Sequence, residues 1–343
     1  MRSAIKNPKN SIAKKVIKTI HKHKKKPIQK STQSKKAKKM SDGLSVAKRV
    51  ANSAKKWLLD TGKKKLILVE QNCNLGDTLH LTPVIHHYRL KYPDAAIAFI
   101  IGQPYHNAHE HNPHIDKLFI APNLDGKTRI QFRKHFIKFE PDIQIIAPSI
   151  FPYGEVWKEL AWSYPNIADQ YLHNSGIKDL KPLGGKKLII KTTEDDIKWA
   201  KDFLKKHNLK GSKTCILEYT SYSAPVQWNV KKWKIYVDRL KHHGIDCVSV
   251  CGPHEGTIPG TISGAGITWR QTAALCSEVA FVTGSGSGIT MVAASAKNQP
   301  KILEIGISPS VTMEGCGYAP SIGISNLDPM VVADHLYYKI MNG

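Results

Sequence analysis

One carboxylate stands where a parallel sheet would place a catalytic group. Residues 65–70 predict a buried strand, a polar loop follows and ends in Gly76-Asp77, and a helical pattern begins at Thr78. A strand, a tight loop and a helix in this order are typical of α/β domains that bind ligands at the carboxyl ends of their strands. Asp77 is therefore either a general base or the cap of the helix, where Asp is favoured.

Gly76 and His80 lie close to Asp77 in the sequence. They are candidates for contact with the acceptor, the substrate whose hydroxyl proton such a base would remove. His80 follows Asp77 by one helical turn, so the two side chains fall on neighbouring positions of one face. The alternative for His80 is a buried histidine whose partners belong to the core.

A second loop suits a phosphate group. Residues 279–284 predict a strand and residues from about 289 to 296 a helix, with GSGSG (284–288) around the junction. The N–H groups of Ser287 and Gly288 would point at an anion there, and the helix dipole would favour it. A Gly-Ser loop can equally be a tight turn.

Three further side chains could assist a bound phosphate. Lys231 is the candidate cation, although it could be an ordinary surface lysine in a basic stretch. Thr220 and Ser221 come directly after the expected strand 215–220, where hydroxyl groups could donate to phosphate oxygens. Metal-free stabilisation of a diphosphate needs such cations and N–H donors.

The elements that would position these residues alternate between strand and helix patterns, twice over. The expected strands are 65–70, 95–102, 117–122, 141–148, 187–192, 215–220, 245–252, 279–284 and 301–306. The expected helices are 78–92, near 105–111, 127–138, 194–207, 231–242, about 289–296 and 328–341. Alternation of this kind predicts parallel sheets. We expect a basic arm over 1–62, one domain over 63–180, a linker over 176–186, a second domain over 187–327, and a helix in 328–343 that returns to the first domain.

The charge is concentrated at the amino-terminal end. The chain of 343 residues carries a formal net charge of +24, and residues 1–65 hold 22 Lys and Arg against 2 Asp and Glu. The rest is nearly balanced. Residues 1–39 cannot bury enough apolar surface to fold and are expected to be disordered. No apolar run is long enough for a membrane span, and the first 40 residues lack the apolar core of a secretory signal.

Residues 43–60 predict a basic amphipathic helix. Its apolar residues recur at helical spacing and its lysines mostly occupy the other side, which suits an anionic membrane surface. The alternative is a helix packed on the body with its lysines in solvent. Nucleic acid is the less favoured partner, because no recognisable binding module accompanies the arm.

The cysteines favour reduced thiols. Six of them are scattered through the chain, which suits a cytosolic protein better than a disulfide framework. Cys247 and Cys251 could share one face of a strand, but no second pair at metal-ligand spacing accompanies them, so no metal site is expected.

With these residues in view, the chain resembles glycosyltransferase family 9, the lipopolysaccharide heptosyltransferases. The likeness spans roughly 64–330 and is strongest in three ordered segments, LGDTLHLTPVI (75–85), YPDAAIAFIIG (92–102) and NPHIDKLFI (112–120). Weaker matches in the second half are Lys231-Lys232-Trp233, GPHE (252–255) and GSGSGITMVAA (284–294).

The resemblance implies a GT-B fold, which consists of two Rossmann-like doubly wound parallel-sheet domains that face a cleft. It also implies inverting, metal-independent transfer of a sugar, usually heptose from ADP-heptose, to a glycolipid. Asp77 matches the family's base, which favours the catalytic interpretation over the cap. Lys231, Ser287 and Gly288 would hold the diphosphate. Glu255 matches a residue that contacts the ribose, and the alternative for it is a solvated glutamate of a loop.

Two positions depart from the family pattern. Its phosphate loop carries an aspartate where this chain has Gly286, and a histidine where it has Met291. The backbone donors are retained, but the side chain that meets the sugar is not. Heptose therefore does not carry over with the rest of the pattern.

These observations favour a glycosyltransferase that moves a sugar from a nucleotide-diphosphate sugar to a lipopolysaccharide-type or other glycan acceptor. It would need no cofactor besides this donor and would act in the cytoplasm, with the arm adding attraction to the inner membrane face. The alternatives are a catalytically degenerate nucleotide-sugar-binding protein and a GT-B enzyme of another class, such as a nucleotide-sugar epimerase.

Overall fold

The structure is a computed structural model. It describes residues 29–72, 74–124, 126–136, 142–148, 167–219, 228–250, 257–284, 288–305, 321–324 and 328–341. By their contacts the residues separate into two units, Met1–Asp42 and Gly43–Gly343. Disorder was expected over residues 1–39, but residues 29–39 form the start of a helix, so the expectation is wrong for that segment, and residues 1–28 lie outside the described residues.

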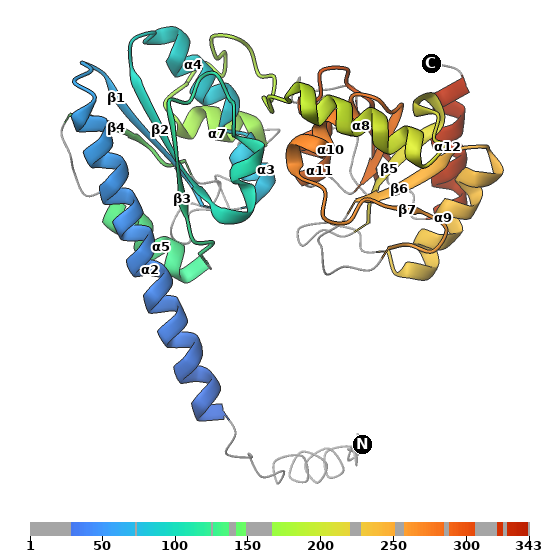
Figure 1. The fold of residues 1–343 in the computed structure, drawn as a ribbon, viewed down its shortest axis with the longest axis horizontal. Coiled ribbons are helices and arrows are strands. Elements are labelled where there is room, and N and C mark those ends of the chain that lie inside the picture. The colour runs from blue at the N-terminus through green and yellow to red at the C-terminus, as the bar shows by residue number, and fades with distance from the viewer. Residues whose placement is uncertain are drawn as a thin grey trace, which may run out of the picture. The chain divides into compact units, whose positions relative to one another are not determined.

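The first sheet of the described residues is parallel throughout. Its strands are β1 (Leu66–Gln71), β2 (Ala96–Gly102), β3 (Lys117–Ala121) and β4 (Ile143–Ile146), in the order β3-β2-β1-β4 (Figure 1). Every residue of β1 and β2 is buried, because both strands lie inside the sheet and are covered on both faces. β1 pairs with β2 and with β4, so its carboxyl end lies at the centre of the sheet edge where ligands bind.

Helices cover both faces of this sheet. They are α2 (Gln29–Asp60), α3 (Leu75–Leu79), α4 (Thr82–Lys91), the 3₁₀ helix η1 (Gln103–Ala108), α5 (Gly126–Phe136) and α7 (Ile167–Asn174). Leu66 and Leu68 of β1 share a core with α2 and α5, whereas Ile67 and Val69 share a core with α4 and α7. Successive residues of β1 therefore face opposite layers, as the alternation of a strand requires.

The amphipathic helix expected over 43–60 belongs to α2, and its apolar face packs on the first sheet. Ala47, Ala51, Ala54 and Leu58 are at most 1% exposed and contact the core around β1 and β2. The side of this helix that would enter a lipid surface is thus already occupied, so the packed alternative describes these residues. No described helix is both long and apolar enough to cross a membrane.

The second sheet is also parallel in its described part. Its strands are β5 (Thr214–Glu218), β6 (Asp246–Val250), β7 (Ile262–Ser263), β8 (Phe281–Gly284), β9 (Lys301–Ile305) and β10 (Ser321–Ile324), in the order β10-β9-β8-β5-β6-β7. The two parallel sheets with helices on both faces confirm the predicted doubly wound fold class.

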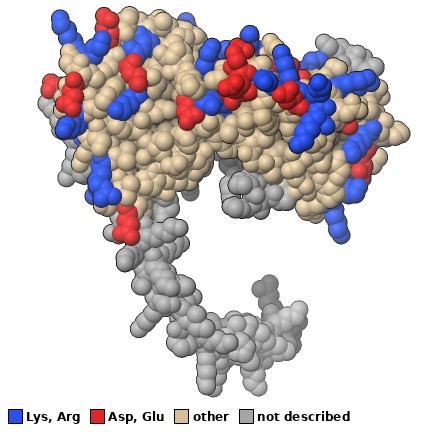
Figure 2. Space-filling view, in the orientation of Figure 1, with Lys and Arg blue, Asp and Glu red and all other residues tan. Residues whose placement is uncertain are grey.

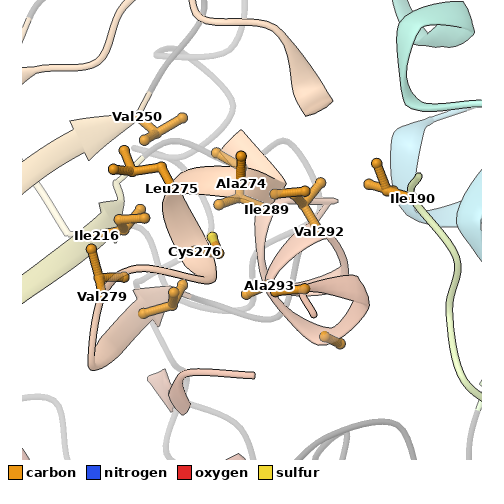
Figure 3. Close-up of a cluster of buried hydrophobic side chains, with 14 of the residues drawn as sticks. Ile190, Ile216, Val250, Ala274, Leu275, Cys276, Val279, Ile289, Val292 and Ala293 are labelled. Atoms are coloured by element: carbon orange, nitrogen blue, oxygen red, sulfur yellow. The ribbon is translucent and has the colours of Figure 1, made fainter. Parts of the chain in front are cut away.

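Helices again divide between the two faces of this sheet. They are α8 (Glu194–Lys206), η2 (Gly211–Lys213), α9 (Val230–His242), α10 (Trp269–Cys276), α11 (Gly288–Ser295) and α12 (Pro329–Met341). Apolar residues of α8, α10 and α11 form one core with Ile216 and Val250 of the sheet, and Figure 3 shows Ile289, Val292 and Ala293 of α11 within it. Residues of α9 and α12 form the core on the other face.

The expectations for residues 187–192 and for the final helix differ from the structure. Residues 187–192 form no strand, and the Ile189 N–H donates to the Thr82 hydroxyl at 2.9 Å. Their alternating burial imitates a strand pattern without sheet pairing. The final helix, α12, was expected to return to the first domain, but it packs on α9, where Asp334 accepts hydrogen bonds from Arg239 at 2.6 and 3.1 Å.

The charges of the body are mixed. Figure 2 shows basic and acidic side chains interspersed over the visible face, without a large area of one sign. This agrees with the near balance of charge after residue 65, and the net positive charge belongs to the amino-terminal part of the chain.

Candidate functional site

Asp77 lies inside α3, directly after the carboxyl end of β1. The helix begins at Leu75, and Asn74 stands at the N-cap position in an extended conformation, with φ −71° and ψ 161°. Asp77 is therefore the third residue of the helix. The cap interpretation is wrong, because the loop after β1 is shorter than predicted and the helix starts before Thr78.

The Asp77 carboxylate is partly exposed and has one described hydrogen bond. The Tyr171 hydroxyl of α7 donates to Oδ1 at 2.8 Å. Among the described residues Oδ2 has no donor. A carboxylate with one oxygen held and the other open can accept a proton from a bound hydroxyl group.

His80 is buried and does not form an open acceptor surface. It is 3% exposed, and its ring stacks on Tyr171 with centroids 5.2 Å apart and planes 17° apart. Burial lowers the pKa of His80 to about 4, although nearby Asp77 opposes that shift. The ring is therefore neutral near pH 7 and packs against the Tyr171 ring without a charge.

A chain of buried polar side chains lies behind Asp77. We call Glu70, Arg133, Gln71 and Tyr171 the buried polar chain; each is at most 3% exposed. Arg133 of α5 donates through Nε to Glu70 at 2.9 Å and through Nη2 to Gln71 Oε1 at 2.8 Å. Gln71 Nε2 lies 3.2 Å from the Tyr171 hydroxyl, which donates to Asp77.

The first turn of α11 contacts the first turn of α3. A Cβ atom at Gly76 would lie 3.9 Å from the Gly288 Cα and 3.6 Å from Met291 Cγ. A Cβ atom at Gly288 would lie 3.1 Å from the Leu75 Cβ, so this close approach favours glycine. The structure thus brings Gly76 and the turn that carries Asp77 next to Gly288, and Met291 fills the adjoining space with apolar atoms.

A polar contact at α10 also joins the layers of the two sheets. Trp269 Nε1 donates to the Pro104 carbonyl oxygen of η1 at 2.7 Å. Arg270 binds Asp196 of α8 at 3.0 Å and also pairs with Glu110 beyond η1. These contacts and the contact between α3 and α11 connect the two sheets within the unit 43–343.

No described contact connects Asp77 with the other residues that were predicted to bind the nucleotide sugar. Lys231 is exposed in the first turn of α9, and the described residues give it no hydrogen bond or ion pair. Thr220, Ser221, Glu255 and Ser287 lie outside the described residues, as does Gly286. Their roles remain predictions.

Two buried glutamates stand at the carboxyl edge of the second sheet. Glu218 and Glu304 end or nearly end β5 and β9, which flank β8, and Glu304 pairs in register with Gly284. A Cβ atom at Gly284 would overlap the Glu218 carboxylate, so the glycine makes room for it. A charged residue at the end of an otherwise apolar strand was the sequence signal for both.

The described residues contain no group of three or more His, Cys, Asp or Glu side chains that could hold a metal ion. Cys215 and Cys247 are register partners on β5 and β6, and both are free and buried. Burial raises the pKa of the Cys215 thiol to about 12, so it stays protonated. Cys251, expected to share a face with Cys247, lies outside the described residues.

Comparisons with known proteins identify the fold. No family model matches the chain, and no curated protein sequence does. A glycosyltransferase family 9 protein from Veillonella parvula has a similar structure, with TM-score 0.60 and 18% identity over 82% of this chain and 98% of that chain. The ADP-heptose LPS heptosyltransferase II of E. coli gives TM-score 0.58 and 14% identity over 80% and 98% of the two chains. At these identities the likeness concerns the fold, and it confirms the predicted GT-B architecture.

Proposed function

We propose that this protein is a glycosyltransferase in which Asp77 removes the proton from an acceptor hydroxyl group. The observation that carries the proposal is the contact between two helix starts, since the turn with Asp77 lies against the turn with Gly288. A base at the end of β1 and N–H donors at the start of α11 are the two groups that metal-free transfer needs. The fold shared with family 9 supports the same reaction class.

The donor in this proposal is a nucleotide-diphosphate sugar, and ADP-heptose is the first candidate because a structural neighbour uses it. The acceptor hydroxyl attacks the anomeric carbon from the face opposite the diphosphate, which inverts the configuration. The acceptor is a glycolipid or glycan at the cytoplasmic membrane face, and the basic residues before 43 add attraction to anionic lipids.

The test uses the full chain and a panel of nucleotide sugars that includes ADP-heptose. Stabilisation against heat reports binding, and nucleotide release in the presence of a lipid-sugar acceptor extract reports transfer. Asp77→Asn should lower transfer by about 10²- to 10⁴-fold and leave donor binding unchanged. Asp94→Asn, an exposed carboxylate in the turn before β2, is the matched control and should behave as wild type. Unchanged turnover in Asp77→Asn would remove the base from the proposal.

Met291 favours a second candidate, a nucleotide-sugar-binding protein without transfer activity. Its side chain packs near Gly76, at the position where the resemblance predicts a histidine. Stabilisation by one nucleotide sugar without nucleotide release, in wild type as in Asp77→Asn, would support this candidate. Stabilisation by no member of the panel would contradict both.

A further inference from the structure

The end of β1 carries two polar residues that face opposite sides of the sheet. Leu66 and Leu68 face the layer of α2 and α5, whereas Ile67 and Val69 face the layer of α4 and α7. By the same alternation Glu70 faces α5 and Gln71 faces α7. Both are fully desolvated, so each requires fixed hydrogen-bond partners.

Arg133 supplies these partners from α5. Its Nε atom donates to Glu70 Oε2, and its Nη2 atom donates to Gln71 Oε1. The ion pair with Glu70 leaves the cluster without net charge. The planar guanidinium group fixes both bonds at once, so Gln71 cannot turn without losing one of them.

The hydrogen bonds that link Arg133, Gln71, Tyr171 and Asp77 each have a defined donor and acceptor. Because Gln71 Oε1 accepts from Arg133, the amide N–H₂ group of Gln71 must face the Pro148 carbonyl and the Tyr171 hydroxyl. The Tyr171 oxygen accepts there, so its own proton points to Asp77 Oδ1. Hydrogen bonds arranged in series strengthen one another in a dry interior.

We propose that Tyr171 is the positioning residue of Asp77, and that Gln71 and Arg133 act through it by fixing the direction of its proton. Rotation of a carboxylate exchanges its two oxygens, and the bond from Tyr171 to Oδ1 stops this exchange. Oδ2 is then the oxygen that takes the acceptor proton while the acceptor oxygen bonds to the anomeric carbon and the diphosphate leaves with the electron pair of the broken bond. This inference rests on the proposed function.

The first experiment separates positioning from packing. Tyr171→Phe keeps the ring that stacks on His80 and removes only the hydroxyl group. With ADP-heptose as donor and a lipid-sugar acceptor extract, we expect kcat to fall by about 10- to 100-fold while the dissociation constant for the donor stays unchanged. Tyr88→Phe is the control, because Tyr88 shares the same core and donates a 2.7 Å bond to the Ser175 carbonyl oxygen, not to Asp77.

Combination with Asp77→Asn sharpens this test. If Tyr171 acts through Asp77, then Tyr171→Phe causes no further loss in the Asp77→Asn background. Equal effects of Tyr171→Phe and Tyr88→Phe on kcat would overturn the proposal, and so would a parallel rise in the donor dissociation constant that accounts for the whole loss.

A second experiment needs no substrate. The chain has 12 tyrosines, so ¹⁹F NMR of fluorotyrosine-labelled protein gives few signals, and the signal missing in Tyr171→Phe identifies Tyr171. Asp77→Ala and Gln71→Leu should each shift this signal and leave that of Tyr88 in place. An unshifted Tyr171 signal in Asp77→Ala would overturn the coupling. If wild type neither binds nor transfers any nucleotide sugar of the panel, the proposed function fails, and the NMR result decides the coupling by itself.

Discussion

Removal of the Arg133 charge should be among the most destabilising single changes in the first sheet. Arg133 is 3% exposed and Glu70 is fully buried, so Arg133→Met leaves an uncompensated carboxylate in the core. It also removes the donor of Gln71 Oε1. Breaking a buried ion pair costs about 3–5 kcal/mol, a large part of the roughly 5–15 kcal/mol by which domains are stable.

The assay is urea unfolding of the full chain, followed by circular dichroism. Arg239→Met is the matched control, because Arg239 also makes two side-chain hydrogen bonds, both to Asp334, but both of these side chains are 31% exposed. We expect a loss of about 1 kcal/mol or less there, because solvent screens the pair. A loss in Arg133→Met as small as in Arg239→Met would refute the account of the buried pair.

A double variant tests whether the loss comes from the stranded charge. In the structure the Asn72 N–H donates to Glu70 Oε1 at 2.8 Å. In the double variant Glu70→Gln with Arg133→Met, residue 70 keeps an oxygen that can accept this bond but carries no charge. The double variant should recover most of the stability lost in Arg133→Met, since replacement of both ionic partners is often nearly neutral. No recovery would show that packing, not charge, accounts for the loss.

Two further predictions concern pH and close packing. Burial lowers the pKa of His80 to about 4 and of His109 to about 3, so the unfolded chain takes up protons first. The contribution of each histidine to the free energy of unfolding is complete above about pH 7.5 and should fall by roughly 2 kcal/mol by about pH 5. The decrease should be smaller in His109→Gln than in wild type; an equal pH dependence would contradict this. Gly211→Ala should lower the free energy of unfolding in urea by about 1–3 kcal/mol, because the new Cβ atom overlaps the Glu278 carbonyl oxygen. Gly43→Ala is the control and should be tolerated, because its new Cβ atom would lie 3.7 Å from the Leu124 side chain. Similar stabilities of the two variants would contradict the clash.

Local pattern was sufficient for most strands and helices. Runs such as 66–69 and 96–102 are apolar throughout because parallel strands are covered on both faces, and this pattern can be recognised from the sequence alone. Residues 187–192 show a misleading pattern. Their burial alternates, as it does in a half-buried strand, but an extended segment that packs on a core without sheet pairing alternates in the same way. The lack of sheet pairing distinguishes that described segment from a strand, and its Ile189 N–H donates to Thr82 instead.

The amphipathic pattern of 43–60 shows the same division. The spacing of its apolar residues established a helix with one apolar side. Binding to a membrane surface and packing on a protein core both require such an apolar side, so the pattern does not distinguish them. The burial of Ala47, Ala51 and Leu58 against the first sheet decided between them. No property of the segment itself contains this information.

The sequence by itself determined that Asp77 follows a buried strand and that a Gly-rich run precedes a helix near 288, because both are local patterns. Only the tertiary structure joined Asp77 to Tyr171, which lies 94 residues later in the chain, and Gly76 to Gly288. A hydrogen bond between distant residues leaves no trace in the periodicity of either segment. The sequence was therefore sufficient to identify a candidate base, whereas the groups that orient this base are determined by tertiary packing around the end of β1.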